Sequence, residues 1–109
     1  MPKSSKGSRR ERELLEKLVK EGFVVHRVAG SGLGQEAICD LVAVKNGEVW
    51  FIECKSRKKV YYSKDNLGQL ESLIEAAKSC KARPILAVKI NYKEWHITDI
   101  EKRIPRKVE

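Results

Sequence analysis

Residues 38–57 decide the fold, and they read Ile-Cys-Asp-Leu-Val-Ala-Val-Lys-Asn-Gly-Glu-Val-Trp-Phe-Ile-Glu-Cys-Lys-Ser-Arg. Two apolar runs flank Asn46-Gly47, a dipeptide that tolerates the positive φ angles of a two-residue type I′ turn, so the stretch predicts a β-hairpin. Counting back from the turn places Asp40 directly opposite Glu53. Two carboxylates are therefore expected to face each other at the open end of the hairpin.

This pair of acids needs a positive partner, because like charges facing each other across a sheet repel by up to about 1 kcal/mol, and by more where water is excluded. Lys55 lies two residues beyond Glu53 and projects from the same face of the strand, whereas Cys54 points to the other face. Such a group suits a hard divalent cation, which one or two carboxylates bind together with water and phosphate oxygens. The spacing predicts a site for phosphodiester hydrolysis; the alternative is a solvated strand edge with one surface salt bridge.

Length and charge limit the possible functions. A chain of 109 residues predicts one domain, residues 1–109, and 23 basic against 15 acidic residues give a net charge of +8, which favours a polyanionic partner such as nucleic acid. No apolar run reaches the roughly 20 residues of a membrane span, and no secretion signal begins the chain, so we expect a cytoplasmic, nucleoid-associated protein. Without a Cys-x-x-Cys pair, Cys39, Cys54 and Cys80 are expected to be reduced, buried thiols.

The N-terminal region predicts a basic flexible arm, residues 1–8, followed by an amphipathic helix. Lys3, Lys6, Arg9 and Arg10 are expected to contact phosphates, with a solubilising tail as the alternative. From Ser8, leucines and a valine recur at helical spacing up to the stop at Gly22. Glu11 extends this apolar stripe by one turn, which would aim a third acid at the sheet. The alternative is a capping box between Ser8 and Glu11.

Residues 23–37 are expected to form a strand and a glycine-rich loop. The strand, residues 23–28, places His26 among apolar residues, so His26 is interpreted as a packed core histidine. In the loop, the backbone at Gly30 and the hydroxyl of Ser31 are candidates for contact with a phosphate near the metal. A plain long connection is the alternative.

Residues 56–64 interleave basic and aromatic side chains, which is typical of a segment that binds a nucleic-acid backbone. The basic side chains would neutralise phosphates and the tyrosines would stack on bases where strands part. The candidates are Arg57, Lys58, Lys59, Tyr61, Tyr62 and Lys64. The alternative is a solvated loop with its tyrosines folded onto the core.

The remaining elements complete the expected fold. A helix is expected over residues 65–80, strands over 84–90 and 94–98, and a polar, frayed tail over 101–109. The order α-β-β-β-α-β-β, with three antiparallel strands before a helical crossover, predicts an α/β fold with a mixed five-stranded central sheet flanked by helices.

Five segments together resemble the archaeal Holliday junction resolvases of the restriction-endonuclease-like superfamily. They are Lys-Gly-Ser-Arg-Arg-Glu-Arg-Glu-Leu at 6–14, Val-Ala-Gly-Ser at 28–31, Asp-Leu-Val-Ala at 40–43, Ile-Glu-Cys-Lys-Ser-Arg-Lys at 52–58 and Leu-Ala-Val-Lys at 86–89. The resemblance covers nearly the whole domain and includes the PD-(D/E)xK nuclease motif, although Cys39 replaces the proline of that motif.

The resemblance implies a restriction-endonuclease-like fold, a homodimer and an active site built from four residues, Glu11, Asp40, Glu53 and Lys55. It further implies that Arg12 and Ser31 lie near the scissile strand, and Gln69 matches a helix glutamine of some relatives. Sliding clamps and branch-migration motors are partners by family analogy alone.

The function expected from these observations is Mg²⁺-dependent, symmetric cutting of four-way DNA junctions in recombination and repair, with Mn²⁺ able to substitute. Asp40, Glu53, Glu11 and the main-chain carbonyl of Cys54 would bind the metal, and Lys55 would orient or deprotonate the attacking water. Two alternatives are a non-catalytic nucleic-acid-binding module and a PD-(D/E)xK nuclease for other DNA structures.

Overall fold

A computed structural model describes residues 6–28 and 38–109; Lys3, Gly30 and Ser31 lie outside these ranges. The helices are α1 (Lys6–Lys20) and α2 (Leu67–Ser79), with a 3₁₀ turn at Ser63–Asn66 directly before α2. The strands are β1 (Val24–Arg27), β2 (Leu41–Lys45), β3 (Glu48–Arg57), β4 (Tyr61–Tyr62), β5 (Arg83–Ile90), β6 (His96–Asp99) and β7 (Lys107–Val108). No helix in these ranges is long and apolar enough to cross a membrane.

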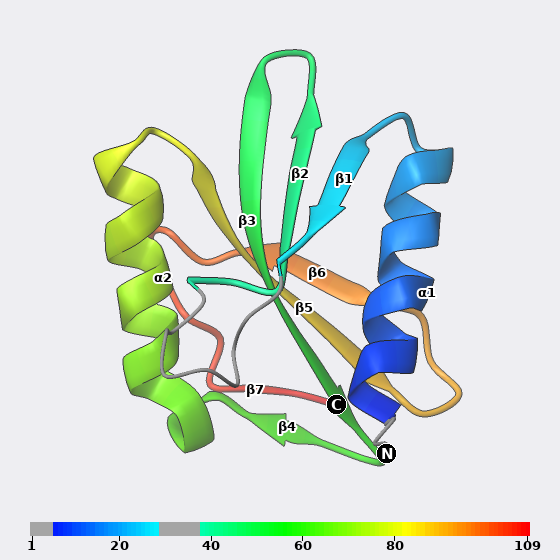
Figure 1. The fold of residues 1–109 in the computed structure, drawn as a ribbon. Coiled ribbons are helices and arrows are strands. Elements are labelled where there is room, and N and C mark those ends of the chain that lie inside the picture. Colours follow the sequence, from blue (N-terminus) through cyan, green and yellow to red (C-terminus); the bar gives the residue numbers. More distant parts are fainter. Residues whose placement is uncertain (1–5, 29–37) are drawn as a thin grey trace.

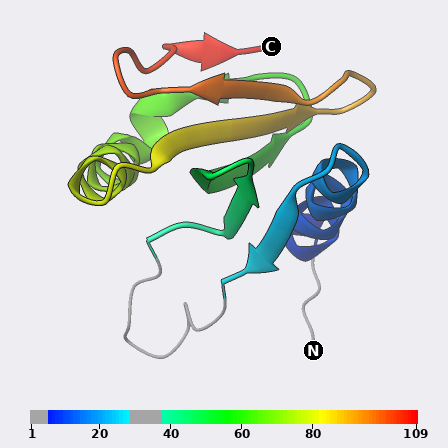
Figure 2. The same ribbon diagram turned by 90° about the horizontal axis from the view of Figure 1, so that it is seen from above.

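A five-stranded sheet in the order β1-β2-β3-β5-β6 forms the centre of the molecule. The first three strands are antiparallel, β5 runs parallel to β3 after the α2 crossover, and β6 is antiparallel to β5. The helices α1 and α2 lie on opposite sides of this sheet (Figures 1 and 2). The predicted mixed sheet, its element order and its flanking helices are confirmed, with the short β4–β7 pair as an addition.

The hairpin of β2 and β3 has the predicted register. Leu41 pairs with Ile52 and Lys45 with Glu48. The turn residues Asn46 and Gly47 have φ angles of 53° and 80°, as a type I′ turn requires. The hairpin therefore brings Asp40, just before β2, to the level of Glu53.

Two apolar clusters hold the helices to the sheet. Leu14 and Leu18 of α1 pack on one face against small and branched residues of β2, β3 and β5. Leu70 and Leu73 of α2 pack on the other face, together with Tyr61. Burial of a leucine side chain contributes about 1.5 to 3 kcal/mol, so the stripes of the two helices fix both helices firmly.

Helix α1 begins at Lys6, earlier than the sequence pattern indicates, and this overturns the capping-box alternative for Glu11. Ser8 lies inside the helix, so it cannot be the N-cap residue. Its hydroxyl instead accepts a hydrogen bond from the Arg27 guanidinium at 2.7 Å. Residues 6–8 of the expected flexible arm are helical, and residues 1–5 lie outside the described ranges.

The expectation of a frayed tail at residues 101–109 is wrong, because the chain end is tied to the core. Val108 is buried and pairs with Tyr61 across β7 and β4. The amide and hydroxyl of Ser63 both donate to the main-chain oxygen of Arg106. Two isolated apolar residues, Ile104 and Val108, in a polar tail were too weak a pattern to predict this short strand.

We expect Val108→Ala to lower the free energy of unfolding by about 1 to 2 kcal/mol, because it removes buried methyl groups and leaves a small cavity beside Tyr61. Urea denaturation followed by circular dichroism measures the change. Arg106→Ala is the matched control, since that exposed side chain should contribute less than about 0.5 kcal/mol. Equal stability of Val108→Ala and wild type would show that β7 does not support the core.

Two smaller expectations are corrected. His26 is exposed rather than packed in the core, because it lies on the outer face of β1, the edge strand. Of the three cysteines only Cys39 is buried; Cys54 is partly buried and Cys80 is exposed after the end of α2. Burial raises the pKa of the Cys39 thiol to about 11, and that of the Cys54 thiol still higher, so both stay protonated near neutral pH.

Candidate active site

The backbone of β3 holds the Asp40 side chain in place. The amide of Asp40 donates to the main-chain oxygen of Ile52 at 2.9 Å. In return, Asp40 Oδ2 accepts a hydrogen bond from the amide of Cys54 at 2.8 Å. The two bonds straddle Glu53, so the predicted meeting of the two acids is present. Hydrogen bonding of one carboxylate oxygen to a main-chain amide also orients the acid without consuming its second oxygen.

Glu53 is a buried acid with one positive neighbour. Glu53 is only 3% exposed, and the Nζ atom of Lys55 lies 3.4 Å from Oε2 of Glu53. Burial, and then the negative charge of Asp40, raise the pKa of Glu53 to about 7, although Lys55 acts in the opposite direction. A carboxyl group this far from water favours a cation that compensates its charge.

Opposing effects also act on the pKa of Asp40. Burial raises its pKa above the usual value, while the Cys54 amide and the positive charges of Lys55 and Arg27 lower it. The main-chain hydrogen bond favours the ionised form of Asp40. The site therefore combines one oriented carboxylate with a second acid that shares its proton easily near neutral pH.

Glu11 reaches the same neighbourhood from α1. Its Oε1 accepts a hydrogen bond from Arg27 Nε at 3.0 Å. Burial and then the charge of Asp40 raise the pKa of Glu11, and Arg27 opposes both effects. Glu11 therefore lies within electrostatic reach of Asp40, held in place by an ion pair.

Arg27 is a site residue that sequence reasoning missed. It lies on the same face of β1 as Val25, and its β2 neighbour Leu41 packs beneath α1. The sequence signal that could have identified Arg27 is this position, because a charged residue on an otherwise apolar face needs a partner nearby. That partner is Glu11, with Ser8 beside it.

We expect Arg27→Met to slow any metal-dependent cutting by about 10- to 100-fold, because groups that orient metal-site residues have effects of this size. The methionine keeps the length of the side chain but leaves Glu11 without its ion pair. Single-turnover rates measure the change. Lys17→Met is the control and should leave the rate unchanged, because it breaks only the exposed Lys17–Glu21 pair at the end of α1. Equal rates for the two variants would contradict a role for Arg27.

The oxygen donors of the site fit a metal ion only in part. Among the residues that the structure describes, no three His, Cys, Asp or Glu side chains are grouped as a complete metal site. Asp40 and Glu53 nevertheless bring two acidic groups close together and supply oxygen donors. This fits a hard cation that takes its other ligands from water and phosphate. The ligand roles of Glu11 and of the Cys54 carbonyl stay predictions.

Comparison with known proteins identifies relatives of this chain. The family model described as archaeal Holliday junction resolvase (Hjc) matches residues 2–107. The chain belongs to this family. The predicted resemblance is thus confirmed over nearly the whole length of the chain.

Individual relatives support the same assignment. The crossover junction endodeoxyribonuclease Hjc of Archaeoglobus fulgidus is 37% identical over 99 residues, which are 89% of this chain and 71% of the relative. The protein of the same name from Methanocaldococcus jannaschii is 44% identical over 92 residues, or 82% of this chain and 62% of the relative. The 1.6 Å structure of Archaeoglobus fulgidus Hjc superposes with a TM-score of 0.75 at 32% identity, covering 94% of this chain and 88% of that one.

These matches establish the fold and the enzyme class of this chain. The restriction-endonuclease-like α/β fold and the assignment as a junction-specific endodeoxyribonuclease are confirmed. Membership of the family implies binding of branched DNA and, as for nucleases of this kind in general, a requirement for a divalent metal.

Most of the predicted basic DNA contacts lie on the surface. The exposed basic side chains are Arg9, Arg12, Lys58, Lys59 and Lys64, and the predicted polar contact Gln69 is exposed as well. Arg57 is partly buried and lies over the ring of Tyr61, with 5.4 Å between the guanidinium carbon and the ring centroid. Arg10 is also partly buried, while Lys6 lies within α1. Exposure leaves the first group free to meet phosphates.

Tyr61 corrects one prediction. It is fully buried, its ring packs with the α2 cluster, and its hydroxyl donates to Asn66 Oδ1. A ring in this position cannot stack on a base, so the alternative of a tyrosine folded onto the core holds for Tyr61. Tyr62 is 38% exposed, with the Lys64 ammonium 5.8 Å from its ring centroid, and stays a candidate.

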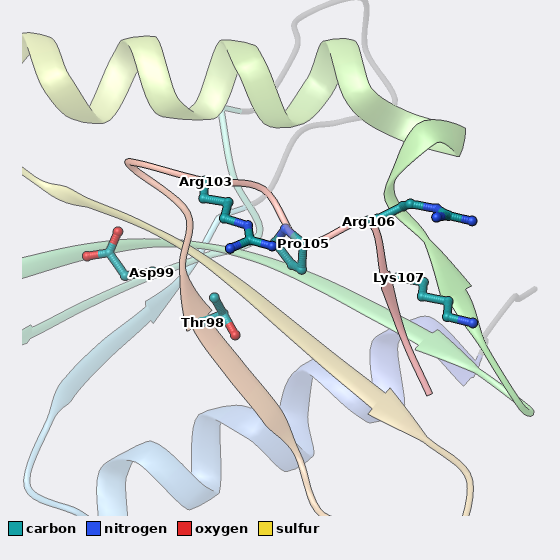
Figure 3. Close-up of a pocket in the computed structure, with 6 residues that line it drawn as sticks. All are labelled: Thr98, Asp99, Arg103, Pro105, Arg106 and Lys107. Carbon is teal, nitrogen blue, oxygen red and sulfur yellow. The ribbon is translucent and has the colours of Figure 1, made fainter.

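A separate hollow lies along β6 and the segment that leads to β7 (Figure 3). Its lining includes the basic residues Arg103, Arg106 and Lys107. Asp99, on its wall, pairs with Arg83 at 2.7 Å. Its lining contains none of Glu11, Asp40, Glu53 and Lys55, so this hollow is not the candidate active site.

Proposed function

We propose that this chain cuts four-way DNA junctions by hydrolysing one phosphodiester in each of two strands of like polarity, with Mg²⁺ as the preferred cation and Mn²⁺ as a substitute. The observation that carries the proposal is the buried Glu53 beside the oriented Asp40, with Lys55 at 3.4 Å from Glu53. Acids and an ammonium arranged in this way serve phosphodiester hydrolysis better than they serve stability.

Each group has a distinct task in this mechanism. Asp40 and Glu53 would hold the divalent cation, which when bound lowers the pKa of water and neutralises charge on the phosphate. Lys55 donates hydrogen bonds to the attacking water or to a phosphate oxygen, and its ammonium partly offsets the rise in the pKa of Glu53 that burial and Asp40 cause. Glu11 and Arg27 complete the polar wall of the site.

Shape rather than base sequence would select the substrate. The net charge of +8 and the exposed lysines of residues 58–64 favour contacts with the DNA backbone, which fix position but carry no sequence information. A homodimer would present two equivalent sites and so match the two-fold symmetry of a four-way junction. A sliding clamp or a branch-migration motor as partner rests on family analogy alone.

The test compares a synthetic four-way junction, with each strand labelled in turn, and a linear duplex of the same sequence, in Mg²⁺, Mn²⁺ or EDTA. We expect paired cuts in two opposing strands of the junction, in metal only, and little cutting of the duplex. Binding without cutting would favour a DNA-binding module. Equal cutting of both substrates would favour a nuclease for other DNA structures.

A further inference from the structure

A second cleft lies between the first turns of α1 and the turn that follows β5, and the proposed mechanism makes no use of it. Arg9, Arg10, Asn91 and Tyr92 line it. Arg10 crosses the cleft: one guanidinium nitrogen donates to Asn91 Oδ1 at 3.3 Å and another to Glu13 Oε1 at 2.9 Å. Its Nε is buried and has no hydrogen-bond partner among the described residues. The floor of the cleft is therefore a positive group with an unused donor.

The wall of the cleft is a tyrosine that folding does not explain. Tyr92 is fully exposed, and its φ angle of 68° lies in the left-handed region that favours glycine or asparagine. The turn holds it there, because the Lys93 amide donates to the Ile90 oxygen at 3.0 Å and the Lys89 ammonium donates to the Lys93 oxygen. The turn accounts for the backbone conformation, but the ring is fully exposed and buries no surface in the fold, which points to a role outside folding.

The cleft lies at the same end of the sheet as the candidate active site around Asp40 and Glu53. Strands β3 and β5 are parallel, Arg57 pairs with Ile90, and the Asn91 amide donates to the Arg57 oxygen at 3.1 Å. The turn after β5 therefore lies beside the start of α1 (Figure 1). Arg57 lies four positions after Glu53 along β3, a distance of about 13 Å at roughly 3.3 Å per residue. One DNA strand covers that distance in about four nucleotides.

We propose that this cleft is a subsite for an unstacked base close to the branch point of the DNA. The Tyr92 ring stacks on the base, Arg9 contacts the adjacent phosphate, and Arg10 with Asn91 forms the polar floor. Bases within a linear duplex are already stacked on their neighbours, so the subsite acts on branched DNA and contributes to selection of the junction. This inference rests on the proposed function.

The experiment measures Kd for the junction and for the matched duplex in EDTA, with wild type, Tyr92→Phe and Tyr92→Gly. Glycine suits the positive φ angle, so the ring is removed without strain, and an unfolding curve verifies the fold. We expect Tyr92→Gly to raise the junction Kd about tenfold, as loss of one stacking contact does, and to leave the duplex Kd unchanged. Tyr92→Phe keeps the stacking face and should bind as wild type.

Three outcomes overturn the inference. Unchanged junction affinity of Tyr92→Gly would mean that the ring serves something other than DNA, such as a protein partner. An equal loss on junction and duplex would mean a general contact without selection of branched DNA. A wild type that shows no preference for the junction would remove the proposed function and this inference with it, whereas a junction preference that is insensitive to Tyr92 removes the inference alone.

Discussion

Glu53→Gln is expected to slow cutting of a four-way junction by about 10³-fold while leaving junction binding at least as tight as in the wild type. The substitution keeps the size of the side chain but removes the negative charge that would help to hold the cation, a change worth several kcal/mol in the transition state. Single-turnover cutting in Mg²⁺ and a gel-shift titration in EDTA measure the two quantities separately.

The control for this prediction is Glu16→Gln, which removes an exposed carboxylate from α1. Its cutting rate should equal that of the wild type. Cutting by Glu53→Gln at the rate of the control would mean that the buried acid is structural. Loss of junction binding together with cutting would place Glu53 in DNA recognition rather than in hydrolysis.

The same Glu53→Gln variant is expected to be more stable than the wild type in EDTA, by about 3 kcal/mol at pH 8. Folding raises the pKa of Glu53 from 4.5 to about 7. Below pH 4.5 the carboxyl group is protonated in both the folded and the unfolded state and costs nothing. Between pH 4.5 and about 7 the unfolded chain has released this proton while the folded protein still holds it, so the free energy of unfolding of the wild type falls across that range and levels off above about pH 7. The glutamine variant has no such loss.

Urea denaturation at pH 4.5 and at pH 8 measures this difference. The stability gain of Glu53→Gln should be present at pH 8 and nearly absent at pH 4.5, and Glu16→Gln should stay within about 0.5 kcal/mol of wild type at both values. A gain of the same size at both pH values would show that packing, rather than ionisation, distinguishes glutamine from glutamate in this site.

The hairpin was predictable because its information is local. Asn46-Gly47 sets the turn, the two-residue period sets the faces, and the register then places Asp40 and Glu53 at the same level. The long stripes of α1 and α2 and the order of elements were equally sufficient for the fold, because they span many residues each.

The features that the sequence did not reveal depend on contacts between distant segments. Arg27 meets Glu11 only after β1 is placed beside α1. Tyr61 becomes a core residue because the distant Val108 pairs with it, and no pattern near residue 61 distinguishes a buried ring from a DNA-binding one. No pattern in the sequence distinguishes Tyr92, since its exposure and its φ angle are properties of the folded chain.

The central claim is that Asp40 and Glu53 together hold the cation that cuts the junction, and a Mg²⁺ titration of the single-turnover cutting rate tests it most directly. We predict that the wild-type rate is zero in EDTA and saturates with Mg²⁺, and that Asp40→Asn stays at least about 10³-fold slower at every Mg²⁺ concentration. A titration in which Asp40→Asn reaches the wild-type rate at the same Mg²⁺ concentration, or in which the wild type cuts equally fast in EDTA, would contradict the account.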